Sequence, residues 1–247
     1  MYTSRLKPEL DLKKSLTPSE YTNLFGDPFW TLPGNAKAKS IYWQMDDKQK
    51  AEMLKANYIK MIEKARQRNW NHAADNLQWW LDGSGFTKII DFKWLRSQRE
   101  VLACENVNIE RFENDKDLRV FVKKLNDGQT DNYIAHFDHS FDGGIFGELY
   151  YMCGTSTITS KCNFKITRKK NDYILSGIIV HNWWDIYDWH KSAHAFIYGF
   201  GIVGDSDALL VEKYCGAKPF KMRSTWKQNF NATFQRESSG ELNLKLK

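Results

Sequence analysis

The sequence predicts an α+β fold, in which a helical N-terminal half packs on an antiparallel, curled, half-barrel-like β-sheet built by the C-terminal half. Apolar residues recur at helical spacing between residues 45 and 126. After Gly128 they alternate with polar residues instead, which is the period of a strand with one solvent-exposed face. The turn formers Asn126, Asp127 and Gly128 stand where the period changes. Runs of helix followed by runs of strand are typical of the α+β class.

Length and composition limit the class of protein further. A chain of 247 residues with 42% hydrophobic residues can form one large domain or two small ones and can offset the entropy of ordering. The net charge is +6, which serves ordinary solubility or attraction to an anionic partner. The charge is dispersed, so no nucleic-acid partner is expected. We expect three regions: an extended N-terminal arm (1–40), a helical region (41–128) and a β-rich activity domain (129–247).

Two further absences bear on where the protein acts. No run of 18 apolar residues is present, so no transmembrane helix is expected. The first residues, MYTSRLKPELDLKK, lack the apolar core of a signal peptide. If the protein acts outside the cytosol, a carrier must therefore take it there.

The N-terminal half begins with a region that holds four of the five prolines, which predicts an arm that wraps the body or docks to a carrier. A helix is expected over 45–68, where Asp46 and Asp47 complement the helix dipole at its start. A second is expected over 71–81, ended by the glycines that follow it. A short strand and one helical turn are expected over 86–104, and a further helix in the second half of 106–125.

The C-terminal half is predicted to consist mainly of strands. Residues 145–154 and 157–168 are expected to pair, and Asn171-Asp172 turns into a buried strand that runs to Trp184. A glycine-punctuated loop, a short helix over 205–214 and a strand over 219–234 follow. Cys153 and Cys162 could form a disulfide across the first hairpin, although reduced core thiols are favoured for the four cysteines.

The segment 183–194, WWDIYDWHKSAH, concentrates carboxylates, imidazoles and aromatic rings where a strand runs out into a loop. Asp185 and Tyr187 would share a face of the extended chain, and a loop could bring His194 back to Asp188. Such groups could hold a divalent metal or act as base and acid. Two close carboxylates would raise one pKa, which suits proton transfer. The plainer interpretation is that Asp188 caps a turn and the aromatic residues pack.

The spacing D-x-Y-D-x5-H, formed by Asp185, Tyr187, Asp188 and His194, resembles the active-site signature of the colicin M family of bacteriocins. The resemblance implies an activity domain on a small curled sheet that cleaves lipid II between the undecaprenyl chain and the pyrophosphate, with Mg²⁺. It implies that Asp185 is the catalytic carboxylate, that Tyr187 and Asp188 support it, and that His194 is an acid or base. Asp185 and Asp188 are the candidate metal ligands.

The family pattern continues with an arginine directly after the histidine, where this chain has Ala195. Lys191 or Arg223 would then have to hold the phosphate. The region through DSDALL and GAKPF is similar to C-terminal regions of antibacterial toxins delivered by contact-dependent secretion. That similarity names no reaction, but it agrees with the missing signal peptide and the basic charge. Together the two resemblances imply a protein made in the bacterial cytoplasm, a secretion-system carrier or chaperone, an immunity protein, and action in the target periplasm on an anionic lipid-linked substrate. We expect a monomer.

A second constellation consists of His136, Asp138 and His139, and His190 is a further candidate near the first. An H-x-D-H segment could ligate a metal or supply a base, although a polar loop is the plainer interpretation. The leading hypothesis is a toxin that hydrolyses a lipid II-type precursor. Three alternatives stay open: a membrane-active toxin whose Trp-rich stretch inserts, a metal-dependent nuclease using His136 and His139, and a module whose aromatics bind a carbohydrate or a partner.

Overall fold

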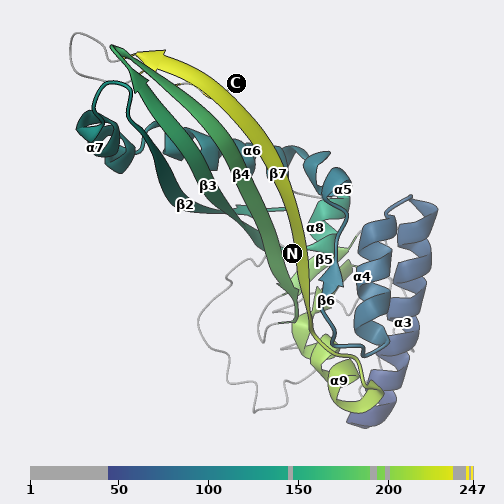
Figure 1. The fold of residues 1–247 in the computed structure, drawn as a ribbon. Helices are drawn as coiled ribbons and strands as arrows, with labels where there is room; N and C mark the ends of the chain where they lie inside the picture. Colours follow the sequence, from purple (N-terminus) through teal and green to yellow (C-terminus); the bar gives the residue numbers. More distant parts are fainter. Residues whose placement is uncertain are drawn as a thin grey trace. The chain divides into compact units, whose positions relative to one another are not determined.

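A computed structural model confirms the α+β class, with helices and a five-stranded mixed sheet (Figure 1). It describes residues 44–143, 147–189, 194–197, 201–235, 243–244 and 246. The sheet has the strand order β1-β7-β4-β3-β2 and is open and only slightly curled. The arm expected over residues 1–40 lies outside the described residues.

The chain forms two compact units, each assembled from separate stretches of sequence. The first unit consists of the described parts of Met1–Lys88, Asp142–Thr155 and Ile186–Met222. The second unit consists of the described parts of Ile89–Phe141, Ser156–Asp185 and Arg223–Lys247. No helix among the described residues is long and apolar enough to cross a bilayer.

The helices of the first unit begin and end where the sequence indicates. α3 (Asp47–Gln67) starts at a capping box, in which Asp46 Oδ1 accepts from the Gln49 amide at 2.8 Å and the Gln49 side chain accepts from the Asp46 amide at 3.1 Å. α4 (Asn71–Leu81) is followed by Gly83 at φ 67°, the left-handed geometry that favours glycine. α9 (Asp205–Cys215) ends before Gly216, at φ 79°.

Two expectations for this unit are wrong. The described part of the run expected as a strand over 145–154 contains the short helix α8 (Glu148–Met152) instead. Seven of the ten positions of that run are apolar, so the sequence shows neither a helical nor a strand period. Gly201 and Gly204 of the glycine-punctuated segment do not lie in a loop either, since β6 (Gly201–Gly204) pairs antiparallel with β5 (His194–Ile197).

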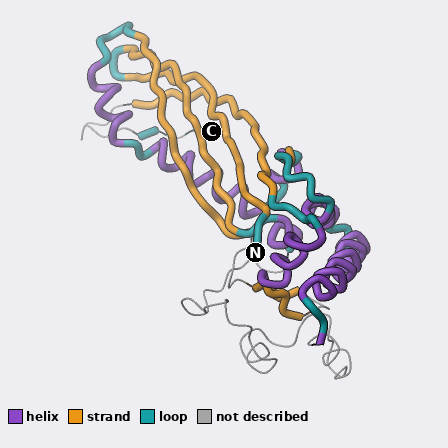
Figure 2. Tube along the Cα trace, turned by 90° about the horizontal axis from the view of Figure 1, so that it is seen from below, coloured by secondary structure: helices purple, strands orange, loops and turns teal. Residues whose placement is uncertain are grey.

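The second unit places helices on one face of the sheet (Figures 1 and 2). The helices are α5 (Phe92–Arg96), α6 (Arg99–Glu113) and α7 (Lys116–Lys124). The sheet strands are β1 (Lys88–Ile89), β2 (Thr130–Asp142), β3 (Thr155–Lys169), β4 (Asp172–Tyr187) and β7 (Phe220–Gln235). Every second residue of β3 and β7 is buried over most of their lengths, as the alternating pattern predicts. The core includes Phe112, Leu118, Val122, Phe164, Ile166, Tyr173 and Phe234.

The strand register is constant across the sheet. β3 and β4 pair antiparallel, with Lys161 opposite Val180 and Thr157 opposite Trp184. β4 and β7 also run antiparallel, because ring pairs form at Tyr187–Phe220, His181–Trp226 and Tyr173–Phe234, always with the same sum of residue numbers. Hydroxyl pairs at Thr130–Thr167 and Ser140–Thr157 show the same for β2 and β3. Residues on neighbouring strands can therefore be matched directly.

All four cysteines are free thiols, so the possible Cys153–Cys162 disulfide is not formed. Cys104, Cys153 and Cys162 are buried, and Cys215 is half-buried. Burial raises the pKa of Cys104 to about 11 and that of Cys162 to about 12. These two thiols are therefore poor nucleophiles in the folded protein.

Candidate active site at the end of strand β4

The D-x-Y-D segment lies where β4 ends, as the sequence predicts. Burial alternates along the strand: Trp183 and Tyr187 are buried, while Trp184 and Ile186 are exposed. Asp185 and Tyr187 therefore occupy the same face of the strand. β4 ends at Tyr187, so Asp188 is the first residue released from the strand, and it is half-buried.

Buried rings fix the backbone on both sides of Asp188. Tyr187 stacks on Phe220 with 5.2 Å between ring centroids and 21° between planes. Trp189 is 7% exposed and packs against Trp80 at 5.5 Å and Tyr58 at 5.8 Å. Packed aromatic rings have few alternative positions. Asp188 is thus a carboxylate held between two anchored residues.

Glu212 of α9 is the partner of Asp188 that the sequence analysis missed. Its Oε1 accepts a hydrogen bond from Trp80 Nε1 at 2.9 Å. Partial burial raises the pKa of Glu212, the Trp80 hydrogen bond opposes that rise, and the negative charge of Asp188 adds to it. Two carboxylates whose surroundings shift their pKa values differently can serve as an acid and a base.

A signal for Glu212 was present in the sequence. Ala208 and Val211 form the buried stripe of α9, and Glu212 follows Ala208 by four residues. A residue at that spacing lies on the same face of a helix. A carboxylate on the apolar face of a predicted helix is a candidate for a shifted pKa.

The predicted magnesium ligands, Asp185 and Asp188, do not complete a metal site with the described residues. No group of three or more His, Cys, Asp or Glu side chains in the described part of the chain could hold a metal ion. Mg²⁺ prefers six oxygen ligands, of which the protein usually supplies one or two carboxylates. Mg²⁺ therefore stays a prediction.

Several predicted site residues fall partly or wholly outside the described residues. His194 is the first residue of β5, but its side chain is not described. His190 and Lys191 are not described at all. Arg223 is exposed on β7, and its carbonyl oxygen accepts from the Ile90 amide at 2.9 Å. Convergence of Asp188 and His194 therefore stays a prediction.

The second constellation lies on strand β2 and not in the polar loop that was expected. His136 and Asp138 are exposed on one face, while His139 is half-buried on the other. The three side chains therefore do not converge. Every second residue of this part of β2 turns towards the core, namely Tyr133, Ala135 and Phe137. This alternation with polar residues is the period of a strand, and it is visible in the sequence.

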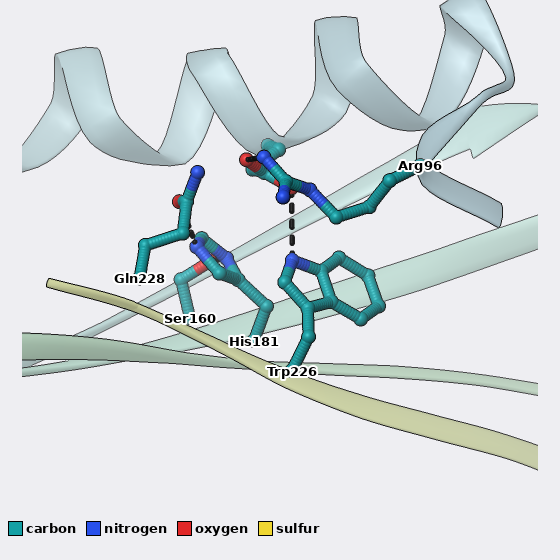
Figure 3. Close-up of polar contacts among 6 residues, drawn as sticks. Arg96, Ser160, His181, Trp226 and Gln228 are labelled. Carbon is teal, nitrogen blue, oxygen red and sulfur yellow. Dashed lines mark hydrogen bonds and ion pairs between the residues drawn. The ribbon is translucent and has the colours of Figure 1, made fainter. Parts of the chain in front are cut away.

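A separate polar network lies buried in the second unit and centres on His181, which is fully buried (Figure 3). Nδ1 of His181 lies 2.8 Å from Ser160 Oγ, and Nε2 lies 2.7 Å from Gln228 Oε1. Since an amide oxygen only accepts, Nε2 donates to it and Nδ1 accepts from the Ser160 hydroxyl. Asn108 Nδ2 donates to the same hydroxyl oxygen at 2.9 Å.

The network continues through Trp226, whose ring stacks on His181 with 5.5 Å between centroids. Trp226 Nε1 donates to Glu105 Oε2 at 2.9 Å, and Arg96 donates to both oxygens of the same carboxylate at 3.1 Å (Figure 3). The Ser160–His181 pair has the contact of a nucleophile with its base, but Ser160 is 1% exposed. A substrate cannot reach the Ser160 hydroxyl in this structure. The hydrogen bonds of the network instead connect the sheet to α5 and α6.

No protein-family model, curated protein or solved structure matches the chain.

Proposed function

We propose that the protein is an antibacterial effector that hydrolyses a phosphoric ester or pyrophosphate bond in a lipid-linked cell-wall precursor of the lipid II type. The supporting observation is the electrostatic influence of Asp188 on the half-buried Glu212, next to a strand end that carries the D-x-Y-D spacing. The resemblance to the colicin M signature supplies the substrate class. The resemblance gives Asp185 the principal catalytic role; with Asp188 as the base, that role would be to hold the divalent cation at the phosphate, with Tyr187, Asp188 and His194 in support.

The carboxylate pair supplies the two proton transfers that hydrolysis needs. An ionised Asp188 would accept a proton from the water that attacks phosphorus. Glu212, which holds its proton to a higher pH than an ordinary glutamate, would donate it to the oxygen of the departing group. One phosphorus–oxygen bond forms and one breaks. The water gives one proton to Asp188, Glu212 gives one to the departing oxygen, and a proton that passes from Asp188 to Glu212 through solvent restores the pair. Each positioned proton transfer contributes about 10²- to 10⁴-fold to a rate.

Replacement of the two aspartates tests the proposal directly. Asp185→Ala should abolish killing by protein directed to the periplasm of a bacterial host, while circular dichroism shows an intact fold. Asp188→Asn should lower hydrolysis of purified lipid II by about 10²-fold or more, since the amide cannot accept the proton. Asp138→Asn, at an exposed aspartate on β2, is the matched control and should keep full activity.

Full toxicity of the folded Asp185→Ala variant would end the assignment. Leakage of dye from protein-free liposomes would favour a membrane-active toxin instead, because that reaction needs no precursor. Degradation of a plasmid by the purified protein with magnesium would favour the nuclease.

A further inference from the structure

The second unit presents one sheet face that its helices leave open. α6 contacts the inward residues, as its hydrogen bonds from Asn108 to Ser160 and from Trp226 to Glu105 show. The alternate residues of β7 from Arg223 onward are exposed, as are those in the middle of β3. Figures 1 and 2 show the described helices of this unit on one side of the sheet, the side that the inward residues face. We call the opposite side the outer face.

Cations predominate among the charged residues of the outer face. Within the second unit its alternating positions carry five cationic side chains, namely Lys161, Lys165, Lys169, Arg223 and Lys227. They carry two carboxylates, Asp138 and Asp172. Asp172 lies opposite Lys169 at the end of the β3–β4 pair, so the centre of the face is more positive than its end. On β3 and β7 the other positions are mainly Thr and Asn, whereas β4 carries Ile174, Ile178 and Val180.

The strand register places two of these cations, Lys161 and Lys227, in one row across the sheet. Lys161 lies opposite Val180, and the β4–β7 register places Lys227 on the other side of Val180. The β2–β3 register places His136 next to Lys161. Strands lie about 4.8 Å apart, so Lys161 and Lys227 stand about 10 Å from each other at the backbone.

Apolar side chains are exposed between and beside the cations. Trp184 is 46% exposed and lies opposite Arg223, and Ile134 on β2 is 55% exposed. Tryptophan beside basic residues is typical of surfaces that lie in the headgroup region of a bilayer. Trp184 is the one aromatic residue at the described outward positions, so the succession of rings that single-stranded nucleic acid stacks on is not present there.

We infer that the outer face binds the surface of an anionic lipid bilayer. The cationic row would contact the phosphate headgroups, and Trp184 would enter the interfacial layer. Binding requires no catalysis and no insertion of a helix, so the inference does not depend on the proposed function.

Sedimentation with vesicles tests the inference on the full chain. The wild-type protein should bind vesicles of phosphatidylcholine and phosphatidylglycerol, and should not bind phosphatidylcholine alone. Lys161→Glu/Lys227→Glu should weaken the binding by about 20-fold or more, since each basic residue near the surface contributes about fivefold. Lys123→Glu/Lys124→Glu changes the net charge equally at two exposed residues of α7, and should weaken it by less than about threefold.

An equal loss in both double variants would overturn the inference, because it would show general attraction without a dedicated face. Unchanged binding of the Lys161/Lys227 variant would overturn it as well. Tighter binding of the wild type to a single-stranded oligonucleotide at the same salt concentration, lost in the same variant, would assign the face to nucleic acid. If the glutamate variant fails to fold, Lys161→Gln/Lys227→Gln replaces it, with an expected loss of about fivefold or more.

Discussion

Single ionisable residues in this protein lie in places where ionisation carries an energetic cost. Glu212 and His181 are the two clearest examples, one at the candidate site and one in the buried network. Both have pKa values moved by burial in the direction that favours the neutral form. Their substitution therefore affects stability and activity in separable ways.

Glu212→Gln should separate catalysis from stability. The amide oxygen can still accept from Trp80 Nε1, and the variant loses both the cost of ionising a half-buried group and its repulsion with Asp188. We expect the melting temperature at pH 7 to stay equal or rise, while hydrolysis falls by about 10²-fold or more.

Glu212→Ala is the companion variant. It leaves the Trp80 indole without its acceptor and should cost about 1–3 kcal/mol. A Glu212→Gln protein that keeps full activity would remove this residue from the mechanism.

His181 should make the protein less stable in mild acid. Burial lowers its folded pKa, with Glu105 and the Gln228 hydrogen bond opposing this effect. Below about pH 6.5, His181 therefore binds a proton in the unfolded chain but stays neutral in the folded chain. The free energy of unfolding falls as the pH falls. Above that pH both states are neutral and the contribution is constant.

The measurement is the free energy of unfolding by urea between pH 7.5 and 5.5. The contribution of His181 to the slope is at most about 1.4 kcal/mol per pH unit. His181→Phe keeps a ring beside Trp226 and should show a shallower slope. A slope that is unchanged in this variant would show that other groups titrate.

At the scale of elements, the sequence predicts those helices and strands whose apolar residues recur with a regular period. α3, α4, β3 and β7 were predicted correctly because a buried face recurs with a clear period in each. α8 and the β5–β6 hairpin were missed because apolar residues and glycines give no period there. The candidate residues at the end of β4 belong to one continuous segment, so the sequence alone could indicate them. Glu212 belongs to a helix 24 positions after Asp188, and only the tertiary structure brings the two carboxylates within electrostatic range.

The β3–β4 pair depends on a glycine in its centre. A Cβ at Gly177 would lie 2.2 Å from the carbonyl oxygen of Asn163 and 2.8 Å from Cα of Phe164, so the backbone would have to shift. Gly177→Ala should lower the free energy of unfolding by about 1–3 kcal/mol. Gly147, where a Cβ meets nothing within 4 Å, provides the control substitution. Equal urea midpoints for the two variants would contradict this role of Gly177.

At the scale of the whole molecule, the proposal concerns the compartment in which the protein acts. A precursor that is exposed at the cell envelope is reached from the periplasm. Expression with an added export signal should therefore kill a bacterial host, whereas cytoplasmic expression at the same level should not. Growth arrest from the cytoplasm alone would place the target there and would point to nucleic acid or a metabolite.

The four free thiols have a practical consequence for the study of the two units. Cys153 belongs to the first unit, Cys104 and Cys162 belong to the second, and all three are buried. An alkylating reagent can modify each of them only when its surroundings open. The order in which mass spectrometry detects the three adducts would therefore reveal whether the units open together or one at a time, without any engineered label.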